Sequence, residues 1–297
     1  MTDRPALARR RFLQGALAAP FAVPFPGAAF ARLAAAPLRI VTLEWLATEM
    51  CLSLGVAPLG VADLALYKEW VGFGQAQLAD AQTLGARQQP GLEAIRRLQP
   101  DLILGSVLRN QGLRQQLQEI APTVLINDLT DGDQLQMVDQ AWLDVCAALD
   151  RPAAEKAAEF TAFLQDRQRR VAQNPPPTRS FVLAQLLPGT SHLRAMTSDA
   201  AAAQALGRIG LQPAIQDPDA RFGFVRIGPE ALARLAPDTR LLLLTDTLPE
   251  ALAQSRLWQA LPLVRQGQVR LIGAHWAFGG YDTLAALVDA ALAQMMG

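Results

Sequence analysis

Two stretches of this chain follow one plan, PGLEAIRRLQPDLIL at residues 90–104 and GPEALARLAPDTRLLLL at residues 228–244. In each copy a glutamate, Glu93 or Glu230, stands seven residues before a Pro-Asp pair. The apolar residues before the proline recur every three or four positions, which predicts a short helix that the proline ends. The aliphatic run after the Pro-Asp pair predicts a buried strand. The chain therefore repeats a unit of helix, stop and strand, with an acidic residue at the same place on each helix.

Strands and helices alternate on both sides of these two stretches. The strands expected from β-rich or aliphatic runs cover residues 39–43, 56–62, 102–104, 123–126, 180–185 and 241–244. The expected helices cover residues 46–54, 92–98, 113–120, 200–210, 257–261 and 283–295. Strands that alternate with helices predict parallel sheets with helices on their faces.

A purely helical region interrupts this alternation. Residues 133–173 carry apolar residues every three or four positions with no strand between them, and the run NPPPT at residues 174–178 ends the region. We therefore predict an α/β fold of two Rossmann-like lobes with parallel sheets, joined by a long helical connector. The predicted domains are an N-terminal lobe at residues 37–132, a helical connector at residues 133–173 and a C-terminal lobe at residues 178–297. Because helices are stiffer than crossing strands, we expect no large hinge closure.

The first 31 residues differ in kind from the rest. Arg9 and Arg10, followed by a short apolar run and by Ala29-Phe30-Ala31, fit a twin-arginine signal peptide with an A-x-A cleavage site. A membrane anchor is the alternative, but prolines at positions 20, 24 and 26 break the apolar run. The run is thus well short of the roughly 20 residues that a membrane span needs. We predict a signal peptide at residues 1–31 and a periplasmic protein exported by the twin-arginine route.

Composition and motifs narrow the classes of function. The chain has 27 basic and 27 acidic residues, and removal of residues 1–31 leaves a net charge of −3, so nothing favours nucleic-acid binding. The two histidines, His192 and His275, are far apart, and no cluster has the spacing of metal ligands. The motifs G-x-S-x-G, H-E-x-x-H and G-x-x-x-x-G-K-[ST] are absent, which leaves an exported enzyme as a weak alternative. Cys51 and Cys146 lie in apolar helical patterns typical of buried thiols, although a disulfide is also possible.

Tryptophans gather where a ligand cleft is expected. In open parallel sheets, ligands lie outside the carboxyl ends of the strands, so two facing lobes enclose a cleft lined by strand-to-helix loops. Aromatic residues make up only 6% of the chain, yet Trp45, Trp70 and Trp276 all follow a strand or lie in a loop. Simple packing is the alternative for any one of them. Together they predict an apolar wall for a ligand.

Three segments carry a resemblance to a known family. They are RIVTLEWLATEMCLSLGVAPLGVADLALYKEW, LGARQQPGLEAIRRLQPDLIL and LWQALPLVRQGQVRLIGAHWAFGG, most densely matched at residues 39–104 and 257–280. The chain resembles the periplasmic ferric-hydroxamate (ferrichrome-type) siderophore-binding proteins of ABC importers, which have the helical-backbone, class III fold. The resemblance implies a monomeric binding protein that delivers a ferric siderophore to an inner-membrane ABC permease. It also implies no cofactor, because the iron is held only through the siderophore. The wider class adds haem, cobalamin and other siderophores as alternative ligands.

The resemblance also implies site residues. Arg87 would donate hydrogen bonds to the iron-bound hydroxamate oxygens, because a guanidinium can address two oxygens at once. The implied aromatic and apolar wall consists of Trp45, Trp70, Phe222, Trp276 and Phe278, with Tyr67 beside it as a packing residue. Arg109 stands where the family has a tyrosine that contacts the hydroxamate. If Arg109 faces the cleft, a second cation would favour a carboxylate-bearing or mixed siderophore.

The repeated glutamates gain a role from the same resemblance. In the wider class, one glutamate on a surface helix of each lobe docks into arginine pockets of the permease dimer. Glu93 and Glu230 hold the matching positions. A solvated helix charge is the alternative for either residue alone. Because they occur in one repeated motif, we predict that both dock the permease and orient the complex.

Overall fold

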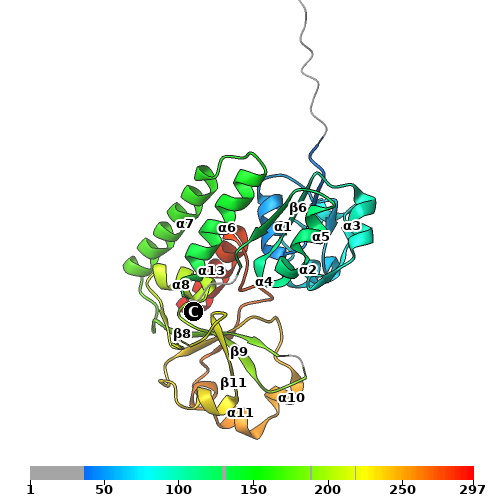
Figure 1. Ribbon diagram of the computed structural model, residues 1–297. Coiled ribbons are helices and arrows are strands. Elements are labelled where there is room, and N and C mark those ends of the chain that lie inside the picture. Colours follow the sequence, from blue (N-terminus) through cyan, green and yellow to red (C-terminus); the bar gives the residue numbers. More distant parts are fainter. Residues whose placement is uncertain (1–36, 129–131, 188, 218) are drawn as a thin grey trace, which may run out of the picture. The chain divides into compact units, whose positions relative to one another are not determined.

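A computed structural model describes residues 37–128, 132–187, 189–217 and 219–297 (Figure 1). The predicted signal peptide at residues 1–31 lies outside the described residues. Residues Leu38–Gly297 form one compact unit. In the described part of the chain, no helix has both the length and the apolar character to cross a bilayer.

The N-terminal half is built on a parallel sheet of five strands in the order β3-β2-β1-β6-β7. Its strands are β1 (Ile40–Thr42), β2 (Gly60–Val61), β3 (Gln82–Thr83), β6 (Leu102–Ser106) and β7 (Thr123–Ile126). Its helices are α1 (Trp45–Ser53), α2 (Leu64–Trp70), α3 (Leu92–Leu98), α4 (Val107–Asn110) and α5 (Arg114–Gln118), with the 3-10 turns η1 (Gln75–Leu78) and η2 (Gln111–Leu113). Because the strands are parallel, their carboxyl ends share one edge of the sheet, where the candidate site lies.

A small hairpin stands at this edge. Strands β4 (Gly85–Ala86) and β5 (Gln89–Pro90) pair antiparallel, with Gly85 opposite Pro90 and Ala86 opposite Gln89. Only Arg87 and Gln88 remain between the two strands, so they form the turn. Gly85 has a φ of 84°, in the left-handed region that glycine adopts without a steric penalty. The hairpin therefore lifts Arg87 to the sheet edge.

Two helices occupy the region where the sequence predicts the connector. They are α6 (Gln134–Ala148) and α7 (Ala154–Gln173). Asp133 caps α6, because its carboxylate accepts a hydrogen bond from the Gln136 amide at 2.8 Å. Both helices pack onto the helices of the C-terminal half that are described next (Figure 1).

The C-terminal half has a mixed sheet. Strands β10 (Gln212–Pro213), β8 (Ser180–Leu186), β12 (Arg240–Leu243) and β13 (Val269–Leu271) run parallel, whereas β9 (Leu193–Met196) and β11 (Phe224–Ile227) join antiparallel beyond β8. The helices are α8 (Ala201–Arg208), α9 (Pro229–Leu232), α10 (Glu250–Ala253), α11 (Arg256–Ala260), α12 (Pro262–Arg265) and α13 (Tyr281–Met296). The sequence predicts neither β9 nor β11, because an arginine interrupts the apolar pattern of each. The fully parallel C-terminal sheet expected from sequence is therefore extended by two antiparallel strands.

The repeated sequence unit forms the same elements in both halves. In the first copy, α3 spans the predicted residues and ends where Gln99 takes a φ of 45°, just before the proline. In the second copy the helix α9 is shorter, only four residues long. Each copy then continues into a buried central strand, β6 or β12. The units are thus equivalent in topology but not in helix length.

One hydrophobic core joins the two halves through the connector. The cluster takes buried residues from each region, among them Ile40, Met50, Leu104, Val138, Trp142, Phe160, Leu164, Leu183, Leu206, Leu242, Leu284 and Leu287. Burial of this many apolar side chains in one cluster couples the regions, since separation of the halves would expose apolar surface. Cys51 and Cys146 are free thiols buried in the same cluster. Burial raises the pKa of the Cys51 thiol to about 12.

A buried carboxylate adds a polar link between the halves. Glu49 of α1 accepts hydrogen bonds from the backbone N–H groups of Gly280 (2.8 Å) and Thr283 (2.9 Å), at the start of α13. It therefore caps the last helix from the first one. Asp282 reinforces the joint by accepting from Lys156 at 2.6 Å and from Ser53 at 2.5 Å. These contacts and the shared core join the two halves, and the small extent of hinge motion stays a prediction.

Candidate ligand-binding site

Two adjoining hollows lie at the carboxyl edge of the N-terminal sheet and reach the C-terminal half. The larger has a volume of about 390 Å³ and the smaller about 240 Å³. Arg87, Arg194 and Trp276 line both hollows, so the two form one continuous site. The size lies within the range of about 300–1,000 Å³ that is usual for small-molecule sites.

Acidic residues follow the carboxyl ends of three strands of the N-terminal sheet. Glu44 comes after β1, Asp63 after β2 and Asp128 after β7. The parallel strand order brings these three carboxylates to the same edge, together with the Arg87 hairpin and Arg109 on α4. Pairing of the parallel strands therefore places three carboxylates that are far apart in the sequence at one edge of the sheet.

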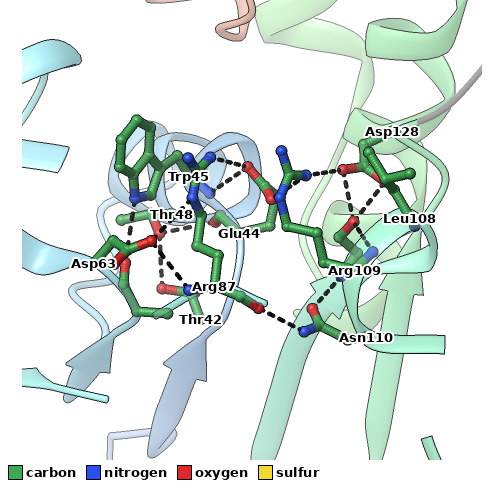
Figure 2. Close-up of polar contacts among 12 residues, drawn as sticks. Thr42, Glu44, Trp45, Thr48, Asp63, Arg87, Leu108, Arg109, Asn110 and Asp128 are labelled. Atoms are coloured by element: carbon green, nitrogen blue, oxygen red, sulfur yellow. Dashed lines mark hydrogen bonds and ion pairs between the residues drawn. The ribbon is translucent and has the colours of Figure 1, made fainter. Parts of the chain in front are cut away.

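Glu44 lies between the two arginines, as Figure 2 shows. One carboxylate oxygen accepts from Arg87 Nη1 at 3.2 Å, and the other lies 2.8 Å from Arg109 Nη1. The backbone N–H of Trp45 also donates to Glu44, at 2.9 Å. Burial raises the pKa of Glu44 and outweighs the two arginines, which act in the opposite direction. The ionised Glu44 carboxylate is thus unfavourable in this buried position unless Arg87 and Arg109 both stay beside it.

Arg87 is fixed on several sides. Besides the bond to Glu44, its Nε lies 3.4 Å from Asp63, and its backbone N–H donates to the same carboxylate at 3.0 Å. Asn110 donates to the Arg87 carbonyl at 2.9 Å. The guanidinium stacks on the indole of Trp45, 3.6 Å from its centroid. Within the described part of the chain, Nη2 of Arg87 forms no hydrogen bond, so this end of the fork remains able to donate into the site.

Arg109 is anchored in a similar way from the other side. Its Nη1 donates to Asp128 at 2.8 Å, and Asp128 in turn accepts from Ser106 Oγ at 2.6–2.7 Å. Arg109 faces the larger hollow, but Glu44 and Asp128 neutralise its charge. Arg109 thus faces the hollow, as the conditional expectation required, and its part in binding a more anionic ligand stays a prediction. Its Nη2 likewise has no hydrogen-bond partner among the described residues.

Aromatic rings form a continuous path across the site. The ring centroids are 5.1 Å apart for Trp45 and Trp276, 5.3 Å for Trp276 and Phe278, and 5.9 Å for Phe278 and Phe224. Phe222 continues the path at 6.1 Å from Phe224 and is 40% exposed. The path gives the polar centre a broad apolar wall.

The structure brings together every ligand-site residue predicted from sequence. Four of them, Arg109, Phe222, Trp276 and Phe278, line the larger hollow, and Trp45 and Trp70 line the smaller one. Arg87 lines both. Tyr67 lies behind Trp45 with its hydroxyl donating to the Phe73 carbonyl at 2.9 Å, which agrees with packing alone.

Sequence reasoning missed the acidic partners and the residues of β9 and β11. Glu44, Asp63 and Asp128 could have been found as acidic residues placed directly after strands. Arg194 and Phe224, which also line the larger hollow, had no such signal, because their strands were not predicted. Among the residues that the structure describes, no group of three His, Cys, Asp or Glu side chains could hold a metal ion.

The predicted docking glutamates lie on the surface. The Glu93 side chain is 78% exposed in the first turn of α3 and pairs with Arg96 at 2.9 Å. Glu230 is exposed in the first turn of α9. Both carboxylates are therefore accessible to a partner, and their docking role stays a prediction.

Comparison with known proteins identifies what the chain is similar to. The periplasmic binding protein family matches residues 40–275. The iron(3+)-hydroxamate-binding protein FhuD of Escherichia coli is 28% identical over 293 residues, which cover 97% of this chain and 95% of FhuD. The Fe(3+) dicitrate-binding periplasmic protein FecB of E. coli is 30% identical over 256 residues, 81% of this chain and 79% of FecB. The crystal structure of Vibrio cholerae FhuD bound to Fe³⁺–Desferal superposes with a TM-score of 0.77 at 24% identity and covers 88% of this chain and 98% of that one.

Proposed function

The chain belongs to the periplasmic binding protein family, and we propose that it captures ferric siderophores in the periplasm and delivers them to an ABC permease of the inner membrane. The ligand class we infer is an iron(III) complex with hydroxamate oxygens, as for the FhuD relative. Iron is bound only through the siderophore, and the protein needs no cofactor and carries out no reaction. The twin-arginine route predicted from sequence would export it.

The observation that carries this proposal is the pair of anchored guanidinium groups. Iron-bound hydroxamate oxygens keep partial negative charge and have no proton to donate, so they need donors from the protein. Arg87 and Arg109 both offer Nη2 donors that the three carboxylates leave unused. Because ion pairs and the Trp45 stack already hold these groups, little side-chain entropy is lost when a ligand binds.

The apolar wall suits the rest of such a ligand. A ferric siderophore presents a compact polar centre and an organic periphery. The aromatic path from Trp45 to Phe222 contacts the periphery in this proposal, while the arginines contact the chelated centre. The shared core and the Glu49 joint favour capture in a largely preformed site.

Delivery is assigned to the repeated glutamates. Glu93 and Glu230 lie on separate halves of the molecule, each in the first turn of a surface helix. Two related halves would meet two permease subunits with one acidic contact each. Such exposed charges mainly set orientation and partner choice, with little effect on ligand affinity.

The proposal is tested by titration of the purified protein with ferrichrome, ferrioxamine B, haem and cyanocobalamin. Tryptophan fluorescence reports binding, because Trp45, Trp70 and Trp276 line the site. We expect saturable quenching by at least one hydroxamate complex, and none by the metal-free chelators at the same concentration. Saturable binding of haem or cobalamin with no response to either ferric complex would overturn the proposal and support one of the alternative ligands.

A further inference from the structure

Arg194 lies in the middle of three paired strands that face the site. On β9 it is opposite Gln185 of β8 and opposite Arg226 of β11. Residues that are directly opposite in an antiparallel pair project from the same face of the sheet. Arg194 therefore has a neutral amide on one side and a second arginine on the other.

The immediate surroundings of Arg194 contain no compensating negative charge. Its Nη1 donates to the Gln185 amide oxygen at 3.3 Å, and its guanidinium lies 4.7 Å from the Phe224 centroid. In the described ranges no carboxylate lies within ion-pair distance of it, in contrast to Arg87 and Arg109. Like charges placed directly opposite each other on paired strands destabilise the sheet. Burial, and then the charge of Arg226, lower the pKa of Arg194.

The position of Arg194 makes it available to a ligand. It lines the larger hollow and the smaller one, as Arg87 does. Arg87 and Arg109 reach the site from the N-terminal half, whereas Arg194 reaches it from the C-terminal half. A ligand between the halves would therefore have two neutralised guanidinium groups on one side and an unneutralised one on the other.

On the premise of the proposed function, we propose that Arg194 binds a carboxylate on the periphery of the ferric siderophore. Arg226 lies opposite Arg194 on the edge strand β11 and adds electrostatic attraction for the same carboxylate. The planar guanidinium fork matches a carboxylate with two parallel hydrogen bonds. An anionic group there would supply the missing counter-charge and relieve the repulsion between the two opposed arginines. The preferred ligands are thus hydroxamate or mixed siderophores that also carry a free carboxylate, rather than neutral or cationic complexes.

A matched pair of ligands tests this specificity. Ferrioxamine B carries a terminal ammonium group, and succinylation of that amine replaces it with a carboxylate on an unchanged ferric centre. We expect the purified protein to bind the succinylated complex at least about tenfold more tightly than the parent, the size expected for a charged hydrogen bond. In Arg194→Gln the affinity ratio should fall to about one, mainly through weaker binding of the succinylated complex.

Control variants separate charge from general damage. Arg194→Lys keeps the cation and should keep most of the preference. Arg256→Gln removes an exposed arginine of α11, which lines neither hollow, and should leave the ratio unchanged. Binding of parent ferrioxamine B by Arg194→Gln with at least wild-type affinity would show that this variant is folded.

The outcomes distinguish the two proposals. Equal affinity of the wild-type protein for the two complexes, or a preference that survives in Arg194→Gln, overturns the Arg194 assignment and leaves siderophore capture intact. A preference that disappears in Arg194→Gln and persists in Arg194→Lys supports it. Binding of neither ferrioxamine complex overturns the Arg194 assignment, and it overturns the proposed hydroxamate capture as well only if ferrichrome also fails to bind.

Discussion

Substitution of Arg87 by glutamine separates a ligand contact from a structural one. The change removes the guanidinium that pairs with Glu44 and Asp63 and stacks 3.6 Å from the Trp45 centroid. It leaves the backbone bond from residue 87 to Asp63 in place, and Glu44 keeps Arg109 at 2.8 Å. Neither carboxylate is therefore left without any partner.

These contacts set the size of two effects. The lost stack and partly compensated ion pairs should lower the free energy of unfolding by about 1–2 kcal/mol. Affinity should fall by more, because the proposed bond from Nη2 to iron-bound oxygen is charge-assisted and is worth about 1.5–3 kcal/mol. That corresponds to a dissociation constant roughly 10- to 150-fold higher for a hydroxamate complex.

The assay combines fluorescence titration, which measures the ligand affinity, with urea unfolding, which measures the free energy of unfolding independently. Arg87→Lys keeps the charge without the planar fork and should give an intermediate affinity. Arg97→Gln, an exposed change on α3, serves as the matched control and should alter neither quantity. An Arg87→Gln protein that binds ferrichrome or ferrioxamine B with wild-type affinity would refute the role assigned to this guanidinium.

Three further predictions concern docking, the joint between the halves and the thiols. Replacement of both Glu93 and Glu230 by alanine should leave ligand affinity unchanged but lower siderophore uptake by cells. Glu49→Gln should reduce the free energy of unfolding by about 1–3 kcal/mol, because the amide turns an N–H group toward the backbone donors of α13. Cys51 and Cys146 should resist a thiol reagent at pH 8 in the folded protein and both react after denaturation, because burial raises both thiol pKa values.

Each of these has an outcome that contradicts it. Normal uptake by cells with the double glutamate variant would exclude the docking role. Burial raises the pKa of Glu49, so the folded protein holds that proton more tightly than the unfolded chain does. The stability difference between wild type and Glu49→Gln should thus be largest below the ordinary glutamate pKa and shrink as the pH rises through the raised value. A stability difference that grows as the pH rises would contradict the role given to Glu49. Failure of Cys51 and Cys146 to react after denaturation would indicate a disulfide and contradict the prediction of free thiols.

Local patterns in the sequence predicted most of the fold. The α3 and β7 boundaries agree with the expected residues, because apolar periodicity, prolines and aliphatic runs act over a few neighbouring positions. The predicted strand at residues 56–62 is reduced to Gly60–Val61, where α3 packs so closely that a Cβ on Gly60 would lie 2.7 Å from Leu98. Strands β9 and β11 escaped prediction, since an arginine breaks the apolar pattern of each.

The sequence by itself determined the alternation of elements, the repeated helix with its glutamate, and the residue types of an aromatic site with arginines. Only the tertiary structure decided which charges meet. Strand order brings Glu44, Asp63 and Asp128 to one sheet edge and neutralises Arg87 and Arg109 there. Strand register places Arg226 opposite Arg194 and leaves that pair without a carboxylate within ion-pair distance among the described residues. Apolar periodicity depends on residues that are neighbours in the chain, so it can be read from the sequence. Compensation of charges depends on residues that are neighbours in space, and these are brought together only when distant strands pair.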